Sequence, residues 1–287
     1  MNDARDASAN DLDAKRERLR GLVTEIGSAA VAFSGGVDST YLLAEARDVL
    51  GRDHVLAVTL TGSVYPPEDL HETNALAKQL DVAHTILEQH PLAIPGFADN
   101  PPDRCYLCKR ALFQSVIDLA HTRGLAAVLD GSNADDAHVY RPGTRALEEL
   151  GVRSPLKEAG LAKSDVRTLS RRLGLSTAER PSSPCLATRF PYGHVITEAA
   201  LERVAAAERR LHHLGYPVCR VRDHGDVARI EVPPDRVARL VAKDGRQITA
   251  DLMALGYAYV TVDLEGYRSG AMDEVLPHTE RGRGKVE

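Results

Sequence analysis

The chain has 287 residues, of which 43% are hydrophobic, and its formal net charge is −5. This length provides enough apolar residues for two domain cores. The acidic balance gives no overall attraction to nucleic acid or to an anionic membrane. No apolar run approaches the ~20 residues that span a bilayer, and the charged N-terminus does not resemble a secretory signal. We therefore expect a soluble, cytoplasmic protein that binds neither nucleic acid nor a membrane.

The first half of the chain alternates between helical periodicity and short β-branched runs. This alternation predicts an α/β fold with a doubly wound parallel sheet. An amphipathic helix with an apolar stripe at Leu19, Leu22, Val23 and Ile26 comes first. The sequence then predicts strands over residues 29–33, 54–60, 83–87 and 126–130, and helices over residues 40–50, 68–80 and 104–123.

The first predicted strand ends in a Ser-Gly-Gly turn that opens a helix, within the segment VAFSGGVDST at 31–40. Two consecutive glycines let the backbone approach an anion, and the helix N-terminus adds roughly half a positive charge. Serine hydroxyls donate to phosphate oxygens, and the aspartate can hold Mg²⁺. The segment is neither a Walker A loop nor a dinucleotide fingerprint. It predicts an ATP and Mg²⁺ site at Ser34, Gly35, Gly36, Asp38 and Ser39.

The segment DGSNADD at 130–136 follows the last of these strands. Because ligands lie beyond the carboxyl ends of parallel strands, we expect it beside the phosphate loop. Residues 137–196 are rich in Arg, Pro and Gly, and three prolines within RPSSPCLATRFPYG at 180–193 predict a shaped loop.

The C-terminal part begins with a long amphipathic helix that has Thr197 as its N-cap and ends at Gly215. Two strands (VCRVRD and VARIEVP), a helix from about Asp235 and a strand over 257–264 follow. This order predicts a smaller α+β domain. We therefore divide the chain into tails at 1–10 and 277–287, an ATP-binding domain at 11–190 and an α+β domain for substrate binding and oligomerisation at 191–276.

Three of the four cysteines have polar, Pro-rich or basic neighbours. Cys105 and Cys108 share one face of a helix start, and Cys185 lies in the Pro-framed loop. Three thiolates can hold a [4Fe–4S] cluster with one open iron or a zinc ion with an outside ligand, or two of them can form a redox disulfide. The fourth, Cys219, fits a buried small apolar residue inside a strand.

Five segments together resemble one known family. AFSGGVDS, NPPDRCYLCK, DGSNADD, RPSSPCLATR and VRDHGDVARIEV, in this order, are similar to motifs of the LarE family of ATP-dependent sacrificial sulfur transferases, which have the PP-loop ATP pyrophosphatase fold. The resemblance covers residues 12–265. It implies adenylation of a carboxylate of pyridinium-3,5-biscarboxylic acid mononucleotide and its conversion to a thiocarboxylate, a step toward the nickel-pincer nucleotide cofactor of lactate racemase.

The resemblance also implies roles for individual residues. Members with one cysteine at the position of Cys185 give up its sulfur. Members with three, matching Cys105, Cys108 and Cys185, are thought to use a [4Fe–4S] cluster that carries an extra sulfide from a sulfide donor. Lys109 is implied near the phosphates or the acyl adenylate. The implied substrate-binding residues are Arg189, Glu208, Arg220, Arg222 and Glu231.

Part of this site also follows from the residue pattern. Arg220 and Arg222 alternate along a predicted strand, so they point to one face, where they suit phosphate and carboxylate groups. Glu208 taken alone fits a helix-surface position paired with His212. Family members are often oligomeric, so we expect a homo-oligomer.

Three other functions compete with this one. A PP-loop tRNA thiolase also combines these cysteines, but the acidic balance argues against it. GMP or NAD synthetases use the same loop, but no glutaminase region is visible and the cysteines would be unexplained. A nucleotide-binding sensor would need neither Asp38 nor three thiols.

Overall fold

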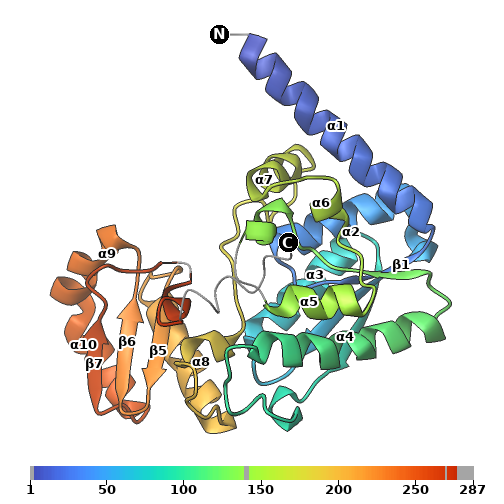
Figure 1. Cartoon of the computed structure of the whole chain (residues 1–287). Helices are drawn as coiled ribbons and strands as arrows, with labels where there is room; N and C mark the ends of the chain where they lie inside the picture. The colour runs from blue at the N-terminus through green and yellow to red at the C-terminus, as the bar shows by residue number, and fades with distance from the viewer. Residues whose placement is uncertain (1–2, 139–141, 269, 277–287) are drawn as a thin grey trace. The chain divides into compact units, whose positions relative to one another are not determined.

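The computed structural model describes residues 3–138, 142–268 and 270–276. The chain forms two compact units that interleave along the sequence (Figure 1). The first unit contains the described residues up to Gly62, then Pro67–Gln89 and Cys105–Ser183. The second contains Ser63–Pro66, His90–Arg104 and the described residues from Pro184 onward. The predicted division near residue 190 would have placed Ser63–Pro66 and His90–Arg104 with the first unit.

The first unit is built on a parallel four-stranded sheet with the strand order β3-β2-β1-β4. Its strands are β1 (Ala29–Ala32), β2 (Val55–Thr61), β3 (Ala83–Glu88) and β4 (Ala127–Leu129). The four predicted strands are therefore confirmed, and every observed end lies within one residue of its predicted position. Parallel strands need crossover connections, and in this chain a helix lies between each strand and the next one, from β1 to β4.

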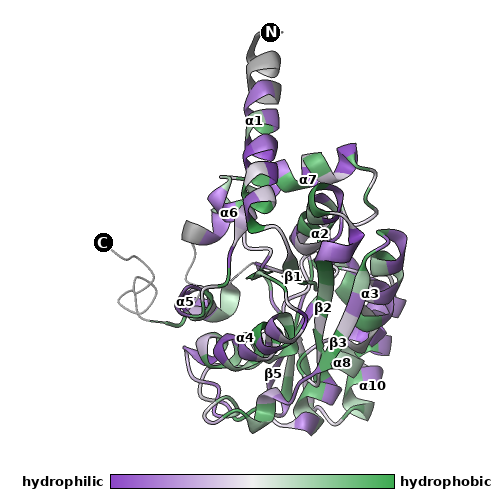
Figure 2. Ribbon diagram, turned by 90° about the vertical axis from the view of Figure 1, so that its right-hand side faces the viewer, coloured by the Kyte–Doolittle hydropathy of each residue, from purple (hydrophilic) through white to green (hydrophobic). Residues whose placement is uncertain are grey.

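Helices cover both faces of this sheet because alternate strand residues face opposite ways. Ala29 and Val31 of β1 pack into one core with α1 (Asp3–Ile26), α2 (Val37–Leu50), α6 (Pro155–Glu158) and α7 (Lys163–Arg172). Ala30 packs into the other core, with α4 (Arg104–Thr122) and α5 (Pro142–Glu149). Ala77 of α3 (Pro67–Gln79) joins the first core. The predicted doubly wound α/β fold is confirmed, and Figure 2 shows hydrophobic colour concentrated on the inner strands.

The second unit has a three-stranded mixed sheet with the order β5-β6-β7. Strands β5 (Arg220–His224) and β6 (Val227–Glu231) form an antiparallel hairpin, and β7 (Tyr259–Val262) pairs parallel to β6. One face of this sheet packs against α8 (Glu198–His213) and α10 (Gly245–Ala254). The helix α9 (Pro234–Arg239) and a π-helical turn (Leu240–Asp244) connect β6 to α10. The predicted strand, strand, helix, strand order is confirmed.

Helix α8 begins as predicted. The Thr197 hydroxyl accepts a hydrogen bond from the Ala200 N–H at 3.2 Å, and Gly215 follows the helix with a φ of +88°. The N-cap oxygen satisfies an amide that the first turn would otherwise leave unpaired.

The prediction was less accurate in two places. Helix α2 begins at Val37, three residues before the predicted start, because Gly36 serves as its N-cap. Helices α5, α6 and α7 lie in the Arg-, Pro- and Gly-rich stretch for which no helix was predicted. They are short, and packing of buried residues such as Leu147, Leu156 and Val166 stabilises them more than local propensity does.

The predicted tails fall partly outside the described residues. Residues 1–2 and 277–287 lie outside them, whereas residues 3–10 belong to α1. The loop predicted over 180–193 contains a short 3₁₀ turn at Leu186–Arg189 and is otherwise irregular. None of the helices in the described ranges is long and apolar enough to cross a membrane.

Candidate active site

The phosphate loop of the first unit lies between β1 and α2. Gly35 adopts a φ of +70°, a conformation that glycine reaches without strain. The Ser34 hydroxyl lies 3.2 Å from the Ser39 hydroxyl, and Ser39 Oγ donates to the Gly36 carbonyl at 3.3 Å. The N-cap Gly36 provides no side chain at the start of α2. The first turn of α2 therefore presents backbone N–H groups and two hydroxyls, which is the arrangement that binds phosphate.

The carboxylate of Asp38 is held from two sides. Its Oδ1 accepts a hydrogen bond from Asn133 Nδ2 at 3.3 Å, and its Oδ2 accepts one from the Lys163 ammonium. The Asp38 side chain is 20% exposed. These contacts fix the carboxylate beside the phosphate loop, and carboxylate oxygens are ligands that Mg²⁺ takes.

The segment at 130–136 packs directly against the loop, as predicted. A Cβ atom on Gly131 would lie 3.0 Å from the Ser39 backbone nitrogen, so any larger residue would force these segments slightly apart. Asp130 is buried and accepts hydrogen bonds from the hydroxyls of Ser132 and Ser154. The end of β4 and the start of α2 thus form one polar edge of the sheet.

Lys109 reaches the same edge from α4. Its Nζ lies 4.0 Å from Asp130 Oδ2, and its aliphatic stem packs so closely on Gly143 that a Cβ there would lie 2.7 Å from Lys109 Cδ. The ammonium is half-exposed and lies 5.7 Å from the ring centroid of Phe113. A basic group is therefore held at the carboxyl end of β4.

The loop is also fixed from the segment that follows α7. Arg180 donates to the Gly35 carbonyl at 3.0 Å and forms an ion pair with Glu72 of α3. Arg167 donates to the carbonyls of Ala178 and Arg180. The Arg-rich stretch thus supports the loop through side chain to backbone contacts.

The three candidate cysteines are divided between the units. Cys105 and Cys108 lie one turn apart at the start of α4 in the first unit, and Cys185 precedes the 3₁₀ turn in the second. All three are half-buried thiols. Within the described ranges, no group of three or more His, Cys, Asp and Glu side chains is gathered closely enough to hold a metal ion. Cys219 is fully buried as predicted, and burial raises the pKa of its thiol.

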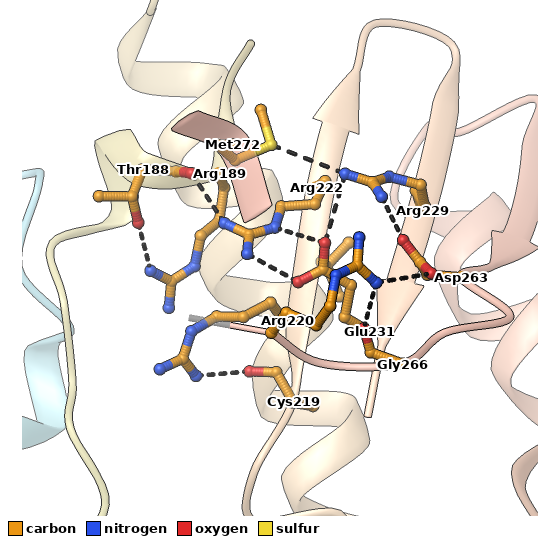
Figure 3. Close-up of polar contacts among 12 residues, drawn as sticks. Thr188, Arg189, Cys219, Arg220, Arg222, Arg229, Glu231, Asp263, Gly266 and Met272 are labelled. Atoms are coloured by element: carbon orange, nitrogen blue, oxygen red, sulfur yellow. Dashed lines mark hydrogen bonds and ion pairs between the residues drawn. The ribbon is translucent and has the colours of Figure 1, made fainter. Parts of the chain in front are cut away.

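In the second unit, charged side chains gather beside β5 and β6 (Figure 3), whereas apolar residues of the same strands belong to the core. The hairpin register places Arg220 opposite Glu231 and Arg222 opposite Arg229, whereas the apolar pair Val221 and Ile230 faces the core. Arg222 binds the Glu231 carboxylate through two hydrogen bonds of 3.0 and 2.6 Å.

Arg189 makes the second paired contact of this kind. Its guanidinium donates to both carboxylate oxygens of Glu208 at 2.8 and 2.9 Å, and both side chains are buried. Burial opposes the charge of Glu208, but the hydrogen bonds and charge of Arg189 outweigh it, so the pKa of this carboxyl lies below its ordinary value. The alternative pairing of Glu208 with His212 on the helix surface is therefore wrong.

Thr188 joins the two pairs. Its carbonyl accepts from Arg222 at 2.9 Å, and its hydroxyl accepts from Arg189 at 2.8 Å. We call Arg189, Glu208, Arg220, Arg222 and Glu231, together with Thr188 and Arg229, the arginine cluster. All five residues predicted from the resemblance as substrate-binding lie in this cluster.

Arg220 differs from its neighbours in its contacts. Its guanidinium donates to the Cys219 carbonyl at 2.6 Å and lies 5.2 Å from the ring centroid of Tyr267. Burial and the positive charge of Arg189 lower the pKa of Arg220. A bound anion beside this guanidinium would offset both effects.

Several residues of these regions were missed by sequence reasoning. Arg229 lies opposite Arg222 in the hairpin and alternates with Glu231 along β6. The alternation along that predicted strand would therefore have found it. Asn133 lies in a segment that was noted as a whole. Lys163 and Arg180 gave no local signal, because their contacts join residues more than 100 positions apart.

A parallel sheet whose first strand delivers Ser-Gly-Gly-x-Asp-Ser onto a helix N-terminus defines a PP-loop ATP pyrophosphatase. In agreement, the model of the NAD synthase family matches residues 12–94, which contain the phosphate loop. A relative of uncharacterized function from Synechocystis sp. is 42% identical over 266 residues, covering 92% of this chain and 99% of the relative.

A second relative carries a specific description. The pyridinium-3,5-bisthiocarboxylic acid mononucleotide synthase of Lactiplantibacillus plantarum is 40% identical over 267 residues, covering 92% of this chain and 96% of that enzyme. The tRNA-specific 2-thiouridylase of Methylobacterium nodulans is 30% identical over 220 residues but covers only 62% of this chain and 56% of that protein. The chain belongs to the LarE family of ATP-dependent sulfur transferases.

Proposed function

We propose that this enzyme adenylates a carboxylate of pyridinium-3,5-biscarboxylic acid mononucleotide and converts it to a thiocarboxylate. The observation that carries the proposal is a phosphate loop with a cation-binding carboxylate, in a chain 40% identical over 92% of its length to a synthase of the bisthiocarboxylic acid mononucleotide. The arginine cluster adds guanidinium groups that suit a substrate with phosphate and carboxylate groups.

The reaction needs two steps because a carboxylate oxygen is a poor leaving group. A substrate carboxylate oxygen attacks the α-phosphorus of ATP, the bond to the bridging oxygen breaks, and pyrophosphate leaves. A sulfur nucleophile then attacks the acyl carbon, and the bond to AMP breaks. The loop residues Ser34, Gly35, Gly36 and Ser39 bind the phosphates, and Lys109 stabilises charge on the acyl adenylate. Mg²⁺ held by Asp38 would offset phosphate charge.

We assign the substrate to the arginine cluster. The guanidinium groups of Arg189 and Arg222 are each bound by a carboxylate of the cluster. These ion pairs hold the arginine side chains in place. Arg220 contacts a carbonyl and an aromatic ring in the same cluster. We propose that its guanidinium, with those of Arg189 and Arg222, faces a phosphate or carboxylate of the substrate.

We further propose that Cys105, Cys108 and Cys185 hold a [4Fe–4S] cluster with one open iron. The donor set fits, because thiolates are the usual ligands and two of them occupy one helical turn. The cluster would supply the sulfur atom, which an external sulfide donor replaces. The proposal includes that Cys185 binds the same cluster as Cys105 and Cys108.

The test combines product analysis with cysteine variants. The protein is reconstituted anaerobically, iron and sulfide are quantified, and it is incubated with ATP, Mg²⁺, substrate and sulfide. Wild type should contain about four irons per chain and release thiocarboxylate, AMP and pyrophosphate. Cys108→Ala should lose the iron, and Cys105→Ala and Cys185→Ala should still release pyrophosphate without forming thiocarboxylate.

Cys219→Ala is the matched control, because its thiol is buried in the core and should not affect sulfur transfer. Unchanged thiolation in Cys105→Ala or Cys185→Ala would contradict the three-cysteine site. Absence of iron, with loss of one sulfur from Cys185 after turnover, would instead support a sacrificial cysteine. No pyrophosphate release with this substrate would overturn the adenylation step itself.

A tRNA thiolase is the second candidate, favoured only by the partial match to the tRNA thiouridylase. The same assay with unmodified tRNA as the acceptor separates the two. Thiolated tRNA, with no thiocarboxylate from the mononucleotide, would establish the alternative.

A homo-oligomer and a cytoplasmic location are also proposed. The second unit exposes large apolar side chains at Tyr259, Leu264 and Val275, which suits contact with a second copy. Light scattering of the purified protein measures the assembly, and a monomer at micromolar concentration would contradict it.

A further inference from the structure

Lys163 contacts the one carboxylate of the phosphate loop, Asp38. It is the first residue of α7, and its ammonium donates to Asp38 Oδ2. The other carboxylate oxygen accepts from the Asn133 amide at 3.3 Å. An ammonium and a divalent cation on the same carboxylate oxygen repel each other, so each weakens the binding of the other. Lys163 therefore opposes coordination of Mg²⁺ by this oxygen.

The backbone of Lys163 is held by hydrogen bonds, whereas its side chain is partly exposed. The Lys163 N–H donates to Asp135 Oδ2 at 2.9 Å, and the preceding Ala162 N–H donates to Asp165 Oδ2 at 3.1 Å. The first contact holds the start of α7 against the segment that follows β4, and the second caps α7 itself. The side chain is 33% exposed and has a flexible four-carbon stem, so the ammonium can move without moving the helix.

A second partner for the ammonium is close by when ATP is bound. Asp38 lies in the first turn of α2, whose N–H groups face the phosphate position. The phosphates of ATP carry more negative charge than one carboxylate. A phosphate bound at the start of α2 would therefore be a stronger acceptor than Asp38 for the Lys163 ammonium.

We propose that Lys163 exchanges between two anions. It neutralises Asp38 in the nucleotide-free enzyme, and it moves to the phosphates of ATP when Mg²⁺ takes its place on the carboxylate. The exchange suppresses Mg²⁺ binding to the empty site and couples Mg²⁺ entry to ATP binding. This inference rests on the proposed role of the loop in binding ATP and Mg²⁺.

The exchange predicts opposite changes in two affinities when Lys163 is replaced by Met. Mg²⁺ binding to the nucleotide-free protein should tighten severalfold, because its competitor is gone. Binding of a non-hydrolysable ATP analogue in the presence of Mg²⁺ should weaken about tenfold, the effect of one charge-assisted hydrogen bond. The mutual enhancement of Mg²⁺ and nucleotide should shrink by the same factor in both directions. A residue that only stabilised α7 would lower both affinities.

The experiment uses the full chain. Mn²⁺, a spectroscopic substitute for Mg²⁺, is titrated into nucleotide-free wild type, Lys163→Met, Lys163→Gln and Lys163→Arg, and free Mn²⁺ is measured by electron paramagnetic resonance. Calorimetry then measures binding of α,β-methylene-ATP with and without Mg²⁺. Lys157→Met is the matched control, because Lys157 pairs with Glu148 on the surface of the same unit at 3.2 Å.

The expected result is tighter Mn²⁺ binding and weaker analogue binding in Lys163→Met and Lys163→Gln, with Lys157→Met close to wild type. Lys163→Arg should retain the suppression of Mn²⁺ binding. Unchanged or weaker Mn²⁺ binding in both neutral variants would overturn the exchange. Failure of wild type to bind the analogue would overturn the proposed function and the exchange with it, whereas analogue binding with unchanged Mn²⁺ affinity in the neutral variants would overturn the exchange alone.

Discussion

The phosphate loop and the arginine cluster both bring charges together, but they balance these charges in different ways. The loop is a backbone structure of consecutive residues, and its one carboxylate, Asp38, is held by a flexible lysine. The cluster is made of side chains from separate elements, and two of its arginines are bound in buried bidentate pairs. The first region is therefore suited to the proposed change of partners, whereas two arginines of the second are already held by buried carboxylates.

The largest effect should come from opening a buried pair. Arg189→Met leaves the Glu208 carboxylate buried without its guanidinium, so the free energy of unfolding should fall by about 3–5 kcal/mol. Urea denaturation followed by circular dichroism measures this change. Arg171→Met removes an exposed ion pair with Glu179, whose side chain is 74% exposed, and should cost at most about 1 kcal/mol.

Equal losses in Arg189→Met and Arg171→Met would show that the cluster is solvated. The contrast with the loop would then disappear, since both regions would hold their charges by exchangeable contacts.

The next effect concerns the loop. In Gly131→Ala the new methyl group would lie 3.0 Å from the backbone nitrogen of Ser39, so α2 must shift. We expect a loss of about 1–3 kcal/mol in the free energy of unfolding and weaker binding of an ATP analogue. Gly21→Ala in α1 is the control, because nothing lies within 4 Å of the added atom, and it should stabilise the protein by roughly 0.5–1 kcal/mol. Normal nucleotide affinity in Gly131→Ala would mean that the loop tolerates displacement.

A smaller effect is expected at the start of the helix that carries Glu208. Thr197→Ala removes the oxygen that accepts from the Ala200 N–H, and the unfolding free energy should fall by about 1 kcal/mol. Thr197→Ser keeps that oxygen and should remain near wild type. An equal loss in both variants would assign the effect to the lost methyl group rather than to the cap.

The smallest effect concerns pH. Because the pKa of Glu208 is lower in the folded protein, its pair stabilises the fold above the unfolded pKa of about 4.3, and this contribution is lost as the pH falls through the lower folded pKa. The melting temperature of wild type should therefore fall more steeply in acid than that of Glu208→Gln. Parallel curves for the two proteins between pH 2 and pH 6 would refute this contribution.

The two regions also differed in how well the sequence predicted them. The loop follows from local rules, since Ser34 to Ser39 are contiguous and Gly35 adopts the left-handed conformation that the turn requires. Alternation along the strand placed Arg220 and Arg222 on one face, but it gave no partner for either. The pairing of Arg189 with Glu208 depends on two elements joined only by the tertiary fold.

The resemblance to a family supplied what local pattern could not. It gave roles to Arg189, Glu208 and Glu231, which the structure places in one cluster, but it gave none to Lys163 or to Arg180, the first residue of RPSSPCLATR. The contacts of those two residues depend on how the helices after β4 return to the loop. The helices α5, α6 and α7 were not predicted from the sequence, so the contacts that depend on them could not be predicted either.

The interleaving of the two units has a consequence for synthesis on the ribosome. Asn100 donates through its side-chain amide to the Pro191 carbonyl at 2.7 Å, and the Val64 carbonyl accepts from the Leu186 N–H at 2.8 Å. Each early residue emerges about 90 to 120 positions before its partner. The first unit is complete once Ser183 has been made, whereas two early segments of the second wait for the remainder of the chain. A fragment that starts at residue 191 therefore lacks part of its own unit, and nascent chains stalled there would leave those segments open to proteases.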